Sequence, residues 1–354
     1  MPGRSNSAPP PQLRRATIAD VAKAAGVSPS TASRALNGSG YAAKHVREQV
    51  RAAAEQIGYV PDANARTLRQ RTSRSVGVVI SDLRNPFYAD LAAGAEQRLR
   101  EAGYSMTLVS DNGLEDEELR AVQTFVALRV PGVIVTPTSG RALNALRRHG
   151  VHVVQADRVV GRPRSDAVLS GNEAGARELT RHLLELGHRR IALLIDETKW
   201  TTGAGRLAGY RAAHEELGVP VDDELTAYAS FDVEQARVAA ARLIDAHRDL
   251  TALFAANNVL AQAVVQEVQQ RGLRVPEDIS IAAYDDVPWM SMVRPGLTTV
   301  SQHTVEMGRR CADLLLDRMS GDAVGARART VHLEPELKVR GSTGKPRRAK
   351  RLPS

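Results

Sequence analysis

The sequence predicts a small all-α head that contains a helix-turn-helix, followed by a larger α/β body with two parallel sheets. Three observations predict this architecture. Two short helical segments with clear start and stop signals follow one another before residue 38. From residue 75 onward, apolar strand-like runs alternate with amphipathic helical segments. The positive charge is concentrated in the head and at the very end of the chain.

The first two helices of the head are marked at both ends. Thr17 can cap a helix, and Asp20, three residues on, completes a capping-box-like pair. Gly26 ends this helix, because glycine adopts the left-handed conformation at low cost. Ser28 is a good cap for the next helix, and Pro29 occupies its first position, where a missing N–H is harmless. Two short helices joined by such a tight turn form a helix-turn-helix.

A third helix, at about residues 44–57, is expected to cover the first two with an apolar stripe of Val46, Val50, Ala53 and Ile57. The second helix ends near Asn37-Gly38 and carries mainly small hydrogen-bonding residues: Ser28, Pro29, Ser30, Thr31, Ser33, Arg34 and Asn37. A helix that enters the major groove of DNA needs short side chains for close approach and a guanidinium to read guanine. The alternative, an ordinary solvated face, agrees less well with the charge of this segment.

That charge is strongly uneven. Residues 1–74 hold 12 Lys and Arg against 4 Asp and Glu, whereas residues 75–344 hold 31 against 36. A compact basic segment is typical of proteins that bind a polyanion. Residues 1–15 and the basic residues 343–354 are expected to be disordered tails.

Several classes of protein are disfavoured. No run of roughly 18 apolar residues could span a membrane, and residues 1–15 lack the apolar stretch of a secretory signal. The single cysteine, Cys311, fits a reducing cytoplasm, where we expect the chain to associate with the nucleoid. No nucleophile elbow, P-loop, zinc spacing or carboxylate pair stands out, so neither an enzyme nor a bound metal or cofactor is expected.

Residues 61–74 connect the head (residues 16–60) to the body (residues 75–342). A helix begun by Pro61 and Asp62 would have only about two turns, so it should form only when docked. Ala65 and Leu68 share one face of this helix between arginines, as an apolar wedge in the minor groove requires. On the residues alone, a plain linker is the favoured interpretation.

In the body, the alternation of elements predicts two parallel sheets, because it contains too many units for one. The expected strands are residues 76–80, 105–109, 132–135, 151–155, 191–195, 225–229, 252–255 and 279–283. Amphipathic helices are expected between them, among others at residues 88–102, 172–186, 205–217 and 258–271.

Polar residues follow many of these strands directly: Ser81-Asp82, Asp111-Asn112, Thr136, Asp157-Arg158, Asp196, Asn257-Asn258 and Asp285-Asp286. Ligands of open parallel sheets bind outside the carboxyl ends of the strands. Two lobes whose strand ends face each other would form a polar cleft that suits a polyhydroxylated ligand. For any single residue, capping of a turn or helix is at least as good an explanation; for the whole set, we favour a ligand cleft.

The head and hinge also resemble the lactose-repressor (LacI/GalR) family of bacterial regulators, and the resemblance continues to about residue 342. The matching segments are Thr17-Ile18-Ala19-Asp20-Val21-Ala22, Ala25-Gly26-Val27-Ser28, Thr31-Ala32-Ser33-Arg34, Leu36-Asn37-Gly38, Gly58-Tyr59-Val60-Pro61 and Ala65-Arg66-Thr67-Leu68. One departure is Asp62, where the family commonly has Asn; an acid near phosphates would weaken hinge docking.

For the head, the resemblance implies a sequence-specific transcription regulator, expected to be a repressor, that binds a near-palindromic operator as a homodimer. It implies that Ser30 and Arg34 face bases and that Leu68 wedges the minor groove. The residues that mainly hold the DNA backbone would be Thr17, Ser28, Thr31, Ser33 and Asn37. Because Pro29 and Ser30 are small, Arg34 is expected to make most of the direct contacts that distinguish one base pair from another.

For the body, the resemblance implies a two-lobed fold like that of periplasmic sugar-binding proteins. One lobe would comprise residues 75–171 and 302–327, and the other residues 172–301 and 328–342. The implied effector-binding residues are Phe87, Tyr88, Asp157, Thr202, Arg206, Phe231, Asn257, Asp285 and Trp289. Arg206 stands out because it can hold a hydroxyl pair or a carboxylate bidentately.

A sugar or sugar derivative is the expected effector, and its binding would change the angle between the lobes, so that the hinge helices form or melt. Trp200 stands where a purine-responsive member would present an arginine, which disfavours a nucleobase without excluding it. Asn258 replaces the family's usual Asp, which leaves a regulator without an effector as a further alternative. A transport binding protein would suit the body but not the basic head.

Overall fold

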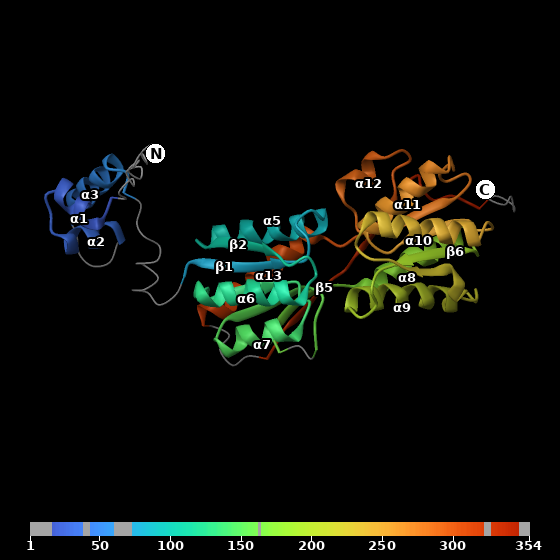
Figure 1. The fold of residues 1–354 in the computed structure, drawn as a ribbon, viewed down its shortest axis with the longest axis horizontal. Coiled ribbons are helices and arrows are strands. Elements are labelled where there is room, and N and C mark those ends of the chain that lie inside the picture. Colours follow the sequence, from blue (N-terminus) through green and yellow to red (C-terminus); the bar gives the residue numbers. More distant parts are fainter. Residues whose placement is uncertain (1–15, 38–42, 60–72, 162–163, 322–326, 347–354) are drawn as a thin grey trace, which may run out of the picture. The chain divides into compact units, whose positions relative to one another are not determined.

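The computed structural model of the chain describes residues 16–37, 43–59, 73–161, 164–321 and 327–346 (Figure 1). The chain divides into two compact units, Met1–Arg71 and Thr72–Ser354. Across the described segments, no helix combines the length and apolar character that crossing a membrane would take.

The head is a three-helix unit made of α1 (Ile18–Ala24), α2 (Pro29–Asn37) and α3 (Lys44–Gln56). The predicted capping box is present: the backbone N–H of Thr17 donates to Asp20 Oδ2 at 2.8 Å, and the Asp20 N–H donates to Thr17 Oγ1 at 3.4 Å. Gly26 has the predicted left-handed backbone, with φ of 62°. Small side chains fill the core: Val21, Ala22, Ala25, Ala32, Ala35, Val50, Ala53 and Ala54. The expected helix-turn-helix with its covering third helix is therefore confirmed.

The body contains two six-stranded sheets. In order across the first sheet, the strands are β11 (Thr330–Leu333), β5 (Asp166–Ser170), β4 (His152–Asp157), β3 (Gly132–Val135), β1 (Ser75–Ile80) and β2 (Ser105–Ser110). Across the second they are β12 (Glu336–Lys338), β10 (Thr298–Ser301), β9 (Ser280–Tyr284), β8 (Ala252–Ala255), β6 (Ile191–Ile195) and β7 (Thr226–Tyr228). Every pairing is parallel except that of β10 with β12, so the predicted parallel α/β architecture is confirmed.

Helices cover both faces of each sheet (Figure 1). The first lobe carries α5 (Pro86–Glu101), α6 (Glu115–Ala127), α7 (Gly140–Arg148) and α13 (Thr304–Ser320); the second carries α8 (Asn172–Glu185), α9 (Thr201–Glu216), α10 (Val233–Ala246), α11 (Asn258–Gln270) and the short α12 (Pro288–Met292). In the first lobe, Val78 packs with the α5 and α13 side chains, whereas Val79 packs with those of α6 and α7. Burial on both faces explains why these strands read as continuous apolar runs.

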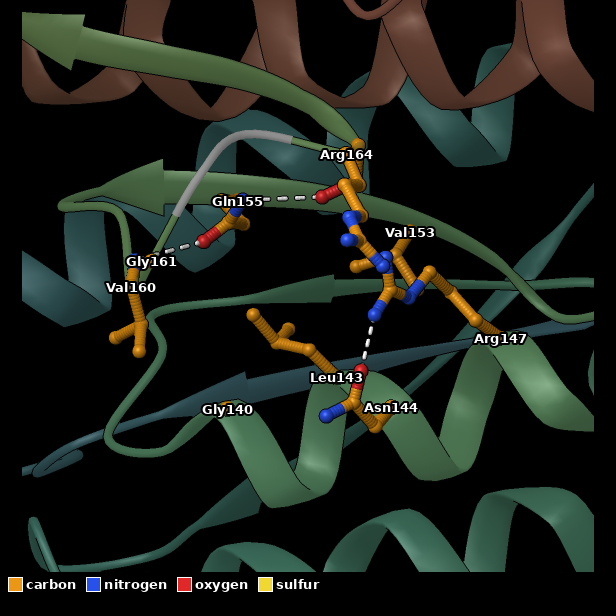
Figure 2. A pocket seen from close by; sticks show the side chains of 10 residues that line it. Gly140, Leu143, Asn144, Arg147, Val153, Gln155, Val160, Gly161 and Arg164 are labelled. Carbon is orange, nitrogen blue, oxygen red and sulfur yellow. Dashed lines mark hydrogen bonds between the residues drawn. The ribbon is translucent and has the colours of Figure 1, made fainter.

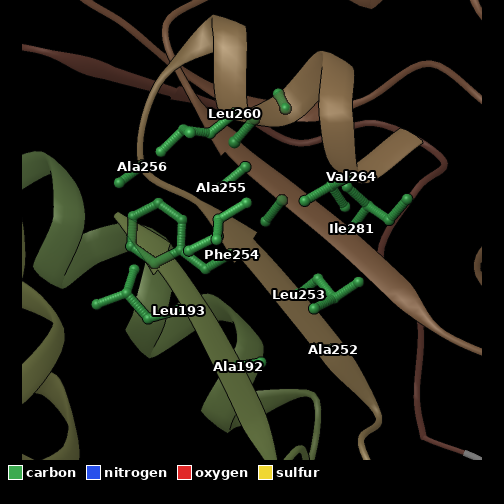
Figure 3. Close-up of a cluster of buried hydrophobic side chains, with 14 of the residues drawn as sticks. Ala192, Leu193, Ala252, Leu253, Phe254, Ala255, Ala256, Leu260, Val264 and Ile281 are labelled. Atoms are coloured by element: carbon green, nitrogen blue, oxygen red, sulfur yellow. The ribbon is translucent and has the colours of Figure 1, made fainter. Parts of the chain in front are cut away.

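The core of the second lobe follows the same plan. Figure 3 shows Leu193 of β6 next to Phe254 of β8, and Ile281 of β9 next to Val264 of α11, with Leu260 of α11 in the same cluster. All five side chains are almost completely buried, so their apolar surfaces stabilise the sheet on which the cleft residues stand.

Two pairs of helices pack with unusually close backbones. A Cβ on Gly308 of α13 would lie 2.0 Å from the carbonyl oxygen of Leu91 in α5, and one on Gly209 of α9 would lie 2.2 Å from that of Glu173 in α8. Only a residue without a side chain permits these contacts. The glycines thus fix how α13 and α9 lie on their lobes.

The chain passes between the lobes after β5, after β10 and after β11. The third passage differs from the expected boundary at residue 328, because β11 pairs in register with β5 of the first sheet. The four strands that the sequence did not predict are β5, β10, β11 and β12, and each of them contains at least two polar residues, which weakens its apolar signal. Each of the eight expected strands overlaps an observed one.

Candidate functional site

The first candidate surface is the outer face of α2 in the head. Ser28, Pro29, Ser30 and Arg34 are exposed. Ser28 Oγ accepts a hydrogen bond from the Thr31 backbone N–H at 3.2 Å, which holds the first turn, and Arg34 Nε donates to the Ser30 carbonyl oxygen at 3.3 Å. The face therefore offers short side chains and one guanidinium on a capped helix, as major-groove reading requires.

The other head residues predicted to contact DNA lie around this face. Thr17 is exposed at the start of α1, Thr31 and Ser33 are half-buried on α2, and Asn37 is its last residue. The predicted hinge residues Ala65 and Leu68 lie outside the described residues.

The second candidate site is a small cavity between the two lobes of the body. It is lined by Asn85, Phe87, Tyr88, Asp157, Arg158, Asp196, Thr202, Arg206, Phe231, Asn257, Asp285 and Gln302. Its volume is about 20 Å³. Most of the polar lining residues follow the carboxyl ends of strands, where ligands of parallel sheets bind.

Arg206 is held rigidly at the second-lobe side of this cavity. Its Nε donates to Asn172 Oδ1 at 2.8 Å and its Nη1 to the Ala256 carbonyl oxygen at 2.7 Å, while the guanidinium carbon lies 4.1 Å from the centre of the Tyr284 ring. Burial alone would lower the pKa of Arg206, but nearby carboxylates, first that of Asp285, keep the pKa above its ordinary value. The site thus presents a fixed cation.

Two buried carboxylates line the same cavity, Asp157 from the first lobe and Asp196 from the second. Asp157 is the last residue of β4 and has a left-handed backbone, φ 69°, and burial raises its pKa to about 6, although Arg158 and Arg206 act in the opposite direction. Burial also raises the pKa of Asp196, which follows β6. Within the described part of the chain, Asp157 Oδ1 and Asp196 Oδ1 accept no hydrogen bond. Such buried acceptors are suited to hydroxyl donors of a ligand.

Asp285 has a different environment. Its Oδ2 accepts hydrogen bonds from the backbone N–H and the side-chain amide of Asn258, at 2.9 and 2.8 Å, and its Oδ1 accepts one from Gln302. Asp285 therefore organises the second-lobe wall, and its negative charge also raises the pKa of Arg206.

Two of the contacts that join the lobes beside the cavity involve Arg158 and Asn258. Arg158, fully buried in the first lobe, donates to Ser81 Oγ at 2.8 Å and to the Pro137 carbonyl oxygen at 2.8 Å, and its guanidinium lies 4.2 Å from the centre of the Trp200 ring in the second lobe. Asn258 Nδ2 donates to Asn85 Oδ1 at 3.0 Å. Both contacts must change when the lobes separate.

Eight of the nine effector residues named from the sequence line this cavity. The exception is Trp289, which lies half-buried on α12 and packs against the core of the second lobe. Of the four other lining residues, Arg158 and Asp196 belong to the polar residues after strands that were expected to form a cleft, whereas Asn85 and Gln302 were not predicted to contact a ligand. Gln302 follows β10, a strand that the sequence did not predict, so the rule that polar residues after strands mark the site could not be applied to it.

Known proteins share both parts of this arrangement. A model described as bacterial regulatory proteins, lacI family, matches residues 17–62, and one described as a periplasmic binding protein-like domain matches residues 180–343. The HTH-type transcriptional regulator DegA of Bacillus subtilis (strain 168) is 34% identical, over 93% of this chain and 98% of its own.

Solved structures agree over the same length. The transcriptional regulator CelR–cellobiose complex is 32% identical with a TM-score of 0.71, over 93% of this chain and 100% of that one. The lac repressor dimer bound to operator and the anti-inducer ONPF is 28% identical with a TM-score of 0.82, over 94% and 100%. With a capped helix-turn-helix, a two-lobed body and relatives that match both, the chain belongs to the LacI family of bacterial transcription regulators.

Proposed function

We propose that this regulator binds a near-palindromic operator as a homodimer, and that a sugar or sugar derivative held between the lobes controls its affinity for DNA. We assign it no enzymatic role. The observation that carries the proposal is the lining of the interlobe cavity, which combines the fixed guanidinium of Arg206 with the buried carboxylates of Asp157 and Asp196, whose Oδ1 atoms accept no hydrogen bond from the residues that the structure describes.

This set of groups fits a polyhydroxylated ligand. A sugar hydroxyl can donate to a carboxylate and accept from a guanidinium at the same time, so adjacent hydroxyls can satisfy both kinds of group. Phe87, Tyr88 and Phe231 line the same cavity and offer apolar ring surfaces for the carbon face of a sugar. The cellobiose complex among the similar structures supports a sugar as the ligand class.

The size of the cavity supports a coupled mechanism. About 20 Å³ is far below the roughly 300 Å³ or more of ordinary ligand pockets, so entry of a sugar requires the lobes to separate. Separation would break the Arg158–Trp200 stack and the Asn258–Asn85 hydrogen bond. An effector that favours one spacing of the lobes then shifts operator affinity by its differential affinity for the two states.

Fluorescence anisotropy with labelled DNA from the gene's own upstream region tests this function. We expect tight binding that one sugar of a panel including cellobiose and ribose changes at least tenfold at fixed salt. Arg206→Ala should bind the same DNA without responding to the sugar.

The matched control is Arg211→Ala, which removes an exposed arginine of the same helix that pairs with Asp223 at 3.1 Å. It should keep the response. Tight DNA binding that no ligand changes would contradict the sugar proposal, and an equal loss of response in both variants would remove the special role of Arg206.

A further inference from the structure

The first lobe has a second, larger pocket that the interlobe mechanism does not use. It lies between α7 and the residue pairs Val160-Gly161 and Arg164-Ser165, and its volume is about 350 Å³. Figure 2 shows its lining: Gly140, Leu143, Asn144, Arg147, Val153, Gln155, Val160, Gly161, Arg164 and Ser165. The two cavities have no lining residue in common.

The charge of this pocket is entirely positive. Arg147 reaches it from the last turn of α7 and Arg164 from just before β5, and none of the described residues that line it is acidic. Among the residues that the structure describes, neither arginine forms an ion pair; Arg147 donates to Asn144 only. The nearest acid along the chain, Asp166, is already bound by Arg318 and Arg329.

Two guanidinium groups that share one pocket without a carboxylate repel each other, and an anion between them would relieve that repulsion. The contrast with the rest of the body is marked, because residues 75–344 carry 36 acidic against 31 basic residues. Structural arginines of the same lobe, such as Arg98 and Arg318, each have a carboxylate partner.

The other lining residues of the pocket indicate which further groups a ligand would have. Leu143, Val153 and Val160 form apolar surface, and Gln155 is fixed by a hydrogen bond to Ser165 Oγ at 3.0 Å and by one from the Val160 N–H at 3.1 Å (Figure 2). The volume lies at the lower end of the range for small-molecule sites. We propose that this pocket binds a small organic anion, with its phosphate or carboxylate group at Arg147 and Arg164 and an apolar part against Leu143 and Val160.

Isothermal titration calorimetry of the full-length protein at fixed ionic strength tests the proposal with three probes: phenyl phosphate, benzoate and inorganic phosphate. We expect one of the two aromatic anions to bind at a single site, at least fivefold more tightly than inorganic phosphate. The comparison of phenyl phosphate with benzoate distinguishes a phosphate from a carboxylate ligand.

Substitutions then test whether the probe binds in this pocket. Arg147→Gln and Arg164→Gln should each weaken binding at least tenfold. The matched control is Arg148→Gln, which removes a neighbouring exposed arginine of α7 that does not line the pocket, and it should change binding less than twofold.

Three results would overturn the proposal. These are an absence of binding by both aromatic anions, equal affinity for inorganic phosphate, and an equal effect of Arg148→Gln and Arg147→Gln, which would indicate general surface charge. Because sugar binding between the lobes is measured separately through Arg206, failure here leaves the proposed function standing.

Discussion

The outer face of α2 and the interlobe cavity, the two candidate sites, present their polar groups in opposite ways. On α2, the polar groups are exposed and held by bonds between residues three or four positions apart, as in Ser28 with Thr31 and Arg34 with Ser30. In the cavity, the polar groups are buried and held by partners far away in sequence, such as Asn258 with Asn85, 173 positions apart.

This difference has an energetic consequence. An exposed side chain on a capped helix loses little hydration before it meets DNA, so the head can be stable and ready to bind at once. Buried carboxylates without hydrogen-bond partners oppose folding, because burial disfavours their charged form. The cavity is therefore expected to lower the stability of the folded body. Substitutions in the cavity should change stability, whereas substitutions on the outer face of α2 should change DNA affinity.

Asp157→Asn should have the largest effect and raise stability at neutral pH. The folded pKa of Asp157 is about 6, above the ordinary value of 3.8, so its carboxylate destabilises the folded body above pH 6 and this penalty disappears as the pH falls through 6 towards 4. The shift corresponds to about 3 kcal/mol at most. Asn also tolerates the left-handed backbone at this position.

Urea unfolding at pH 5.0 and pH 7.5 measures the effect. The free energy of unfolding of the Asn variant should exceed that of the unmodified protein by more at pH 7.5 than at pH 5.0. The control Glu215→Gln, an exposed position on α9, should stay within about 0.5 kcal/mol at both. If the difference in the free energy of unfolding between Asp157→Asn and the unmodified protein does not change with pH, the buried charge of Asp157 does not destabilise the folded body.

Arg34→Ala should act on DNA binding and leave stability unchanged. Loss of a bidentate base contact costs about 1–3 kcal/mol, or roughly 5- to 150-fold in operator affinity. Because Arg34 is exposed, the melting temperature should not move. Anisotropy with the operator and with a scrambled duplex measures both affinities.

Arg34→Lys serves as the matched control, since it keeps the charge but not the forked geometry. It should lose operator affinity and keep binding to the scrambled duplex. If the lysine variant binds the operator as well as the unmodified protein does, Arg34 contributes charge and does not read a base.

The same contrast explains what could be predicted from the sequence. The caps of α1 and α2, the left-handed Gly26 and the three-helix core follow from residues close together in the chain, and all are confirmed. The apolar strands buried on both faces were also recognisable, because their composition alone distinguishes them.

The cavity was only partly predictable. Polar residues after recognised strands, such as Asp157 and Asp285, were found, whereas Gln302 follows a strand whose residues, Thr-Thr-Val-Ser, carry a weak signal. Trp289 was predicted to contact the ligand because an aromatic side chain can stack on a sugar ring. The packing of α12 shows instead that Trp289 lies against the core of the second lobe. The paired arginines of the first-lobe pocket are 17 positions apart, and no local pattern indicates that they share it.

Thr17→Ala gives the smallest expected effect and tests how far the head depends on local bonds. The substitution removes the side-chain half of the capping box on a helix of only seven residues, so it should destabilise the head by about 1 kcal/mol. Hydrogen exchange of the α1 amides should quicken, while exchange in α8 and α9 of the body stays unchanged. Thr17→Ser, which keeps the hydroxyl, should restore slow exchange; if it does not, the methyl group and not the cap stabilises α1, and the head is held by packing as the body is.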